Sequence, residues 1–78
     1  MPRKNIEVVV HINETLDNPS INRLESRLSK EHGIEKVHIN PVRQHLMMVD
    51  YSPENVNIRQ VLGYVNNNGV HAKLIGGI

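Results

Sequence analysis

Hydrophobic and polar residues alternate in three segments, 6–12, 34–40 and 45–51, and a shorter alternation runs from Val70 to Leu74. Because successive side chains of a strand point to opposite faces of its sheet, each alternation predicts a β-strand with one face toward a core. The side chains predicted to face that core share the hydrophobic parity of their strand: Ile6, Val8, Val10, Ile12, Val37, Ile39, Met47, Val49, Tyr51, Val70, Ala72 and Leu74.

A first helix is predicted between the first two strands. Asn18 is expected to cap it, with Pro19 at the first helical position, where proline loses no hydrogen bond. Gly33 is expected to end it, because glycine readily adopts the left-handed conformation that follows many helices. The hydrophobic stripe of this helix has the spacing i, i+3, i+7 and consists of Ile21, Leu24 and Leu28.

A second helix is predicted between the last two strands. Asn57 is its expected N-cap, and Gln60, three residues later, completes the pattern of a capping box. Val56 and Val61 occupy the two positions of a hydrophobic staple around this cap. The stripe of the helix consists of Ile58, Val61, Leu62 and Val65.

The order of these elements, βαββαβ, is that of two right-handed βαβ units joined by a hairpin. It predicts one α+β domain over residues 1–78 with the ferredoxin-like fold. The antiparallel sheet is expected to have the strand order 4-1-3-2, with both helices on one face. The other face of the sheet is then left open.

Composition excludes several functions. The 78 residues contain no cysteine, which removes disulfides, thiolate metal sites and thiol nucleophiles. A net charge of +1 and only two tyrosines disfavour nucleic acid as a partner, since that needs a basic surface or stacking aromatics. No apolar run reaches membrane length and no secretion signal is visible. We expect no nucleic-acid partner, no membrane insertion and a cytoplasmic location.

Catalytic patterns are missing from the sequence. It contains no Gly-rich phosphate loop, and none of its serines has a histidine at the spacing of a nucleophile–base pair. The expectation is therefore that the chain is not an enzyme.

Three segments resemble the heavy-metal-associated (metallochaperone-like) domain family. Residues 33–40, GIEKVHIN, are similar to its Gly-Val-x-x-Val-x-Val segment, and residues 49–53, VDYSP, to its Val-x-Tyr-Asp-Pro strand end. The stripe of the second helix, followed by GVHA at 69–72, resembles its second helix and Gly-Tyr-x-Ala close. The resemblance covers most of the chain after Gly33, and it implies the βαββαβ fold and an ancestry in metal-ion transport.

The same resemblance places the family's two metal-ligating cysteines near Asp17 and Ser20. In that family two thiolates hold a soft ion such as Cu(I). A carboxylate and a hydroxyl are hard oxygen donors and do not replace thiolates for such an ion. We therefore predict no tight Cu(I) binding and interpret residues 17–20 as a helix start, with an oxygen-ligand site as the alternative.

Histidines offer a different metal site. His11 and His71 are predicted on the open face of neighbouring antiparallel strands, opposite each other, with Met48 on the next strand. Imidazole suits divalent transition metals, so these three residues are a candidate site for Zn, Cu or Ni. The competing interpretation is that exposed strand histidines are ordinary surface residues, and both stay open.

The open face is also more hydrophobic than expected. A half-covered antiparallel sheet normally places polar residues outward. Here four apolar residues, Val9, Leu46, Met48 and Ile75, have the outward parity. Exposed apolar surface of this kind usually marks a protein partner or self-association, and the competing interpretation is that these are scattered surface residues that bind nothing. A cysteine-less interaction module is therefore the leading functional hypothesis, and metal-ion binding or transport through His11, His71 and Met48 is the alternative.

Overall fold

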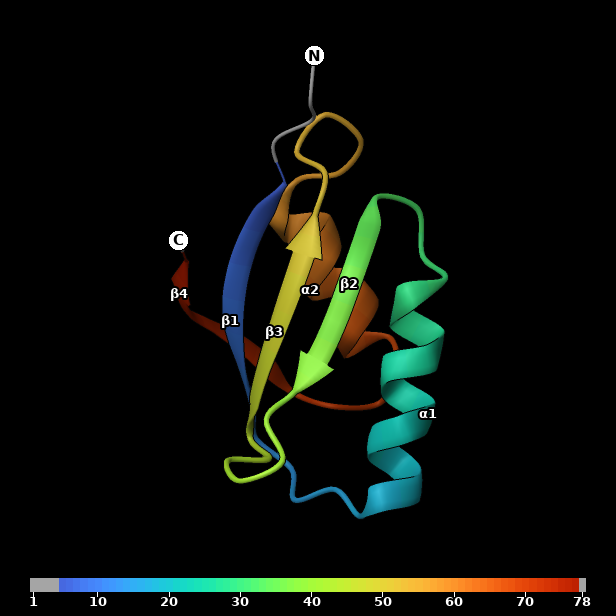
Figure 1. Cartoon of the computed structure of the whole chain (residues 1–78), viewed down its shortest axis with the longest axis vertical. Coiled ribbons are helices and arrows are strands. Elements are labelled where there is room, and N and C mark those ends of the chain that lie inside the picture. The colour runs from blue at the N-terminus through green and yellow to red at the C-terminus, as the bar shows by residue number, and fades with distance from the viewer. Residues whose placement is uncertain (1–4, 78) are drawn as a thin grey trace.

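A computed structural model describes residues 5–77, in which four antiparallel strands form one sheet that two helices cover on one face (Figure 1). The elements are β1 (Ile6–Ile12), α1 (Asn18–Ser29), β2 (Ile34–Ile39), β3 (Leu46–Tyr51), α2 (Ile58–Asn66) and β4 (Ala72–Gly77). The strands are ordered β2-β3-β1-β4, which is the predicted order 4-1-3-2 read from the other edge. The predicted ferredoxin-like βαββαβ fold is confirmed.

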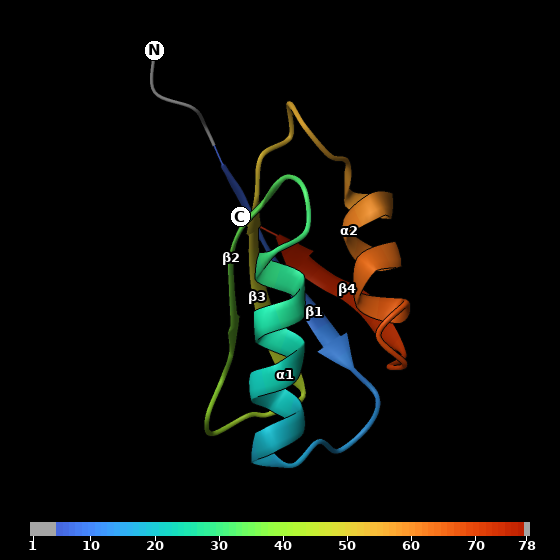
Figure 2. The same ribbon diagram turned by 90° about the vertical axis from the view of Figure 1, so that its right-hand side faces the viewer.

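The core lies between the sheet and the two helices, which stand on the same side of it in the edge-on view of Figure 2. The predicted parity is confirmed on β1, where Val8, Val10 and Ile12 are buried, and on β3. The buried hydrophobic side chains are Val8, Val10, Ile12, Ile21, Leu24, Leu28, Ile34, Ile39, Met47, Val49, Tyr51, Val56, Val61, Val65 and Val70. The opposite face of the sheet has no helix over it in either view.

The start of α1 differs from the prediction by one residue. Asp17, not Asn18, is the N-cap: its backbone is extended (φ −79°, ψ 170°) and its Oδ1 accepts a hydrogen bond of 2.9 Å from the Ser20 N–H. Aspartate and asparagine are both good N-cap residues, so the residue types alone did not show which of the two neighbours caps the helix. The helix ends at Ser29, with Lys30 as C-cap, and Gly33 adopts its left-handed φ of +84° at the entry to β2 rather than directly after the helix.

The start of α2 agrees with the prediction. The Gln60 N–H donates to Asn57 Oδ1 and the Asn57 N–H donates to Gln60 Oε1, both at 2.9 Å, which is a complete capping box. Val56 and Val61 are both buried around this cap. The sequence predicted this helix start well because the capping box and the hydrophobic staple both require the helix to begin after Asn57.

The sheet departs from simple alternation on β4. A bulge shifts the β1–β4 register between Val9 and Val10, so that Val9 is opposite Gly76 while Val10 is opposite Leu74. Leu74 keeps the predicted inward parity but is 42% exposed, because β4 is an edge strand with a neighbour on one side only. Val70, predicted as part of this strand, is buried but precedes it.

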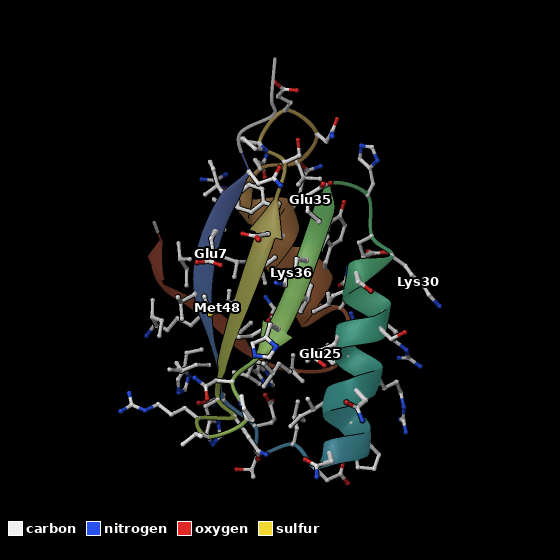
Figure 3. All side chains as sticks on the ribbon, viewed as in Figure 1. Glu7, Glu25, Lys30, Glu35, Lys36 and Met48 are labelled. Atoms are coloured by element: carbon white, nitrogen blue, oxygen red, sulfur yellow. The ribbon has the colours of Figure 1, made fainter. Side chains whose placement is uncertain are left out.

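The edge strand β2 is covered by α1. The Ile39 N–H, at the end of β2, donates a 2.8 Å hydrogen bond to Glu25 Oε2 on the helix. Figure 3 shows Glu25 on α1 beside the end of β2. A backbone donor that would otherwise face solvent at the sheet edge is thereby satisfied from within the chain.

Candidate functional site

The uncovered face of the sheet, which we call the open face, is turned toward the viewer in Figure 3, where Glu7, Lys36 and Met48 lie over β1, β2 and β3. Strand alternation and the observed registers assign its residues. They are Glu7, Val9 and His11 on β1, Lys36 and His38 on β2, Leu46, Met48 and Asp50 on β3, and Lys73 on β4. The open face is therefore built from all four strands.

Apolar residues occupy the middle of the open face. Val9 and Met48 are direct cross-strand partners on β1 and β3, and Leu46 stands two residues before Met48 on the same strand. All three are half-buried by their neighbours, although no second layer covers them. Val9 and Met48 are in contact, because directly opposed side chains on one face touch, and Leu46 extends this apolar strip along β3 to the level of His11, its partner on β1.

Ile75 has no partner in the observed register, and its place on the open face stays a prediction. The bulge on β4 leaves Ile75 without a partner on β1, and so the alternation that assigned it to the open face is interrupted at that residue. Ile75 is 52% exposed at the outer edge of the sheet.

Charged residues occupy the two ends of the open face. At one end Asp50 is opposite Glu7 on β1 and opposite Lys36 on β2; at the other end His11 is opposite Leu46 on β3 and opposite Lys73 on β4. A shallow hollow of about 90 Å³ lies at the first end, lined by Glu7, Lys36, His38, Met48 and Asp50. Within residues 5–77 none of these charges takes part in an ion pair, because the one pair found there joins Glu14 and His71.

The predicted pairing of His11 with His71 is wrong. His11 is opposite Lys73, and β4 begins only at Ala72. His71 stands beyond the strand, where its carbonyl accepts a 2.9 Å hydrogen bond from the Asn13 N–H. The prediction placed the first residue of β4 two positions too early and so moved His71 into the sheet.

His71 is instead bound to the loop between β1 and α1. Its backbone N–H donates to Glu14 Oε1 at 2.8 Å, and its ring Nδ1 lies 2.5 Å from Glu14 Oε2. The hydrogen bond from the His71 backbone, followed by that from its ring, lowers the pKa of the Glu14 carboxyl. The loop before α1 is thereby tied to the start of β4.

A different histidine accompanies His11. The rings of His11 and His45 stack at 15°, with their centroids 5.7 Å apart. His45 Nδ1 lies 2.7 Å from the Ile12 carbonyl, and because a carbonyl only accepts, Nδ1 is the donor of this hydrogen bond. Sequence reasoning missed His45 because its parity is that of the core residue Met47. The pairing of the end of β1 with the start of β3 could have revealed it.

No group of three or more His, Cys, Asp or Glu side chains suited to hold a metal ion occurs among residues 5–77. Metal binding by His11, His71 and Met48 stays a prediction, although the register separates His11 from His71. Within the same part of the chain, no helix is long and apolar enough to cross a membrane.

The two positions that the family resemblance assigned to cysteines contact each other. The Ser20 side chain, followed by the hydrogen bond from the Ser20 N–H, lowers the pKa of the Asp17 carboxyl. The carboxylate is used as a helix cap, as the interpretation of residues 17–20 as a helix start requires.

Known structures with this arrangement of strands and helices include copper-binding domains. No protein-family model and no curated protein sequence matches the chain. The copper-binding domain of HMA7, a P-type ATPase, superposes with a TM-score of 0.83 at 17% identity, over 92% of this chain and 96% of that one. The chain shares the βαββαβ fold of this copper-binding domain. The resemblance predicted from the sequence is thereby confirmed at the level of the fold, and the chain contains no cysteine.

Two further structures with the heavy-metal-associated fold agree. The N-terminal domain of a potential copper-translocating P-type ATPase from Bacillus subtilis, solved with Cu(I) bound, matches with a TM-score of 0.83 and 23% identity over 96% of this chain and 92% of that one. The copper chaperone of Enterococcus hirae matches with a TM-score of 0.75 and 19% identity over 87% and 98%. The fold is thus shared over nearly the full length of each of the three compared chains.

Proposed function

We propose that this chain is a protein-binding module that uses the open face of its sheet. The observation that supports it most directly is the Val9–Met48 pair, with Leu46 beside it, on a face that no helix covers. Apolar side chains at the centre of an uncovered sheet face are stabilised when a partner removes them from water. Charged residues around them, such as Glu7 and Lys73, provide the polar rim that specific interfaces have.

The start of α1 supports the same proposal, because it lacks the cysteines that would make it a metal site. Structural neighbours include copper chaperones, and the heavy-metal-associated fold is retained here. The positions assigned to cysteines hold Asp17 and Ser20, which are engaged with each other. Without thiolates, the helix start of this scaffold cannot bind a soft metal ion. The open face is then the surface best suited to bind a partner. Under this proposal the chain is not an enzyme, and it is located in the cytoplasm.

The test compares two substitutions that each put a glutamate in place of an apolar side chain. Met48→Glu changes the centre of the open face, while Val42→Glu changes a residue that is 88% exposed in the loop between β2 and β3. Binding of any identified protein partner, measured by titration calorimetry, should be lost with Met48→Glu and kept with Val42→Glu. Self-association, measured by analytical ultracentrifugation, should respond in the same way.

The opposite pattern would reject the proposal. If binding survives Met48→Glu but is lost with Asp17→Ala, the helix start, and not the open face, is the binding surface. Unfolding curves of all three variants show whether a loss of binding comes from a loss of fold.

A second candidate function is binding of a divalent transition metal such as Zn, Cu or Ni. The stacked His11 and His45 rings favour it, because one imidazole has its Nε2 oriented by a backbone hydrogen bond, as metal-binding histidines commonly do. Calorimetric titration with each metal tests it. A site of His11 and His45 loses affinity with His45→Ala and not with His71→Ala; the set of His11, His71 and Met48 predicted from the sequence requires the reverse.

A further inference from the structure

We propose that the occupant of the open face is a second copy of this chain, packed face to face with its strands running in the opposite direction. The inference rests on the proposed function, because it names the partner of the same surface. It follows from the distribution of charge along the strands, which distinguishes one pairing of two identical faces from the other.

The open face has three zones along the strand direction. Glu7 and Asp50 are opposite each other at one end, and Val9 and Met48 are opposite each other in the middle. At the far end His11 lies between Leu46 on β3 and Lys73 on β4. Glu7 and His11 are four residue steps apart on the extended strand, a distance of about 13 Å. The open face therefore changes from acidic through apolar to basic, with Lys36 offsetting one acidic charge at the outer edge on β2.

A closed dimer of identical chains has a two-fold axis, and two orientations of that axis keep the strands of both sheets aligned. An axis parallel to the strands places like ends together, so that Glu7 of one copy meets the partner's Asp50. An axis across the strands exchanges the ends, so that Glu7 meets the end that carries the partner's His11 and the partner's Lys73. Like charges opposite each other are destabilising, and this selects the second orientation.

The same orientation keeps the apolar strip in contact with itself. The middle zone lies on the axis, where Val9 and Met48 meet the partner's Val9 and the partner's Met48. Facing sheets pack about 10 Å apart at an angle of about −30°, which preserves contacts near the centre. Methionine adapts to such a small interface, since its unbranched side chain has three rotatable bonds.

The size of the open face sets the strength of this dimer. Four strands at about 4.8 Å spacing and about 18 Å length present roughly 350 Å² per copy. Stable interfaces bury about 800 Å² on each partner. We therefore expect a weak dimer that is populated only at high protein concentration and that weakens as added salt screens its charges.

The test uses charge reversal of one residue at each end. Glu7→Lys and Lys73→Glu each put like charges together in their own homodimer, and each should weaken self-association about tenfold or more in analytical ultracentrifugation. A mixture of the two variants should associate again, because the heterodimer pairs the new lysine with the new glutamate and leaves the remaining Glu7–Lys73 contact intact. Within one chain, Glu7→Lys places a positive charge opposite Asp50, and Lys73→Glu places a negative charge opposite His11. Neither substitution creates a repulsive pair inside the chain.

Each outcome distinguishes this inference from the proposed function. A chain that stays monomeric at all concentrations, while Met48→Glu abolishes binding of another protein, overturns the second-copy inference and leaves the open-face proposal standing. A dimer that resists Met48→Glu and both charge reversals overturns both. A dimer that is sensitive to Met48→Glu, but whose two charge variants do not recover on mixing, overturns the antiparallel arrangement.

Discussion

Gly33 and Val56 are in such close contact that a β-carbon on Gly33 would lie 2.6 Å from both γ-carbons of Val56. This contact joins the loop before β2 to the loop before α2. The Gly33 carbonyl accepts a 2.8 Å hydrogen bond from the Ser52 N–H, and the Val56 N–H donates to the Ser52 carbonyl at 3.1 Å. Backbone hydrogen bonds on both sides therefore leave neither residue free to move away.

Gly33→Ala should lower the free energy of unfolding by about 2–4 kcal/mol, because alanine is strained at φ +84° and overpacks against Val56. Urea unfolding measures the loss. Gly63→Ala is the matched control: Gly63 lies inside α2, where an added β-carbon would meet no neighbouring element within 4 Å, and alanine there should add about 0.5–1 kcal/mol. Equal stability of the two variants would contradict the close contact.

Leu28→Ala should destabilise the chain by about 2–5 kcal/mol, because Leu28 is 1% exposed between α1 and the sheet and its truncation leaves a cavity. That loss is large for a domain of this length. Ser26→Ala on the exposed side of the same helix is the control and should change stability little. A loss below about 0.5 kcal/mol for Leu28→Ala would be incompatible with its place in the core.

Acid should weaken the contact between Glu14 and His71. Hydrogen bonds from His71 lower the pKa of Glu14, so the folded chain binds a proton there less readily than the unfolded chain does. The stabilisation is complete above the unfolded pKa of about 4.3 and is lost as pH falls through the lower folded pKa. Glu14→Gln should therefore flatten the pH dependence of urea unfolding below about pH 4.5.

The control for this measurement is Glu54→Gln, which changes an exposed carboxylate in the loop between β3 and α2. It should retain the slope of the parent chain. An identical slope in Glu14→Gln and the parent would mean that the His71 contact does not persist in solution.

Copper(I) should not be held by the parent chain in competition with bicinchoninate, because Asp17 and Ser20 offer oxygen donors. The double substitution Asp17→Cys and Ser20→Cys should create a Cu(I) site. Both side chains stand at the start of α1, where the helix end also favours thiolates. The pair Asp17→Cys and Asn22→Cys, with the wrong spacing, is the control. Copper binding by the parent chain, or none by the first double variant, would contradict the assignment of these positions.

The fold was predictable because local and global signals agreed. On β1 and β3 the alternation of buried and outward residues is complete, since one face of the sheet is covered and the other is not. The capping box of α2 fixed that helix start in the same way. At α1, two good capping residues stand side by side, and only the hydrogen bond from Ser20 to Asp17 decides between them.

The candidate site was less predictable because it depends on register. Alternation assigned Val9, Leu46 and Met48 to the open face correctly, and these residues face the same side whatever the neighbouring strand does. The pairing of His11 and the position of Ile75 depend on where β4 begins and on its bulge. A shift of one residue changes which side chains meet across two strands, and sequence alternation carries no information about such a shift.

The hydrogen bond from Ile39 to Glu25 has a consequence for polymerisation. A sheet with an apolar face and two free edges is a template for strand-by-strand growth into fibrils. Here the helix carboxylate occupies a donor at the end of β2, and the bulge distorts β4 at the opposite edge. Lateral growth is obstructed at both edges, so the apolar open face can stay uncovered without strand-by-strand extension of the sheet.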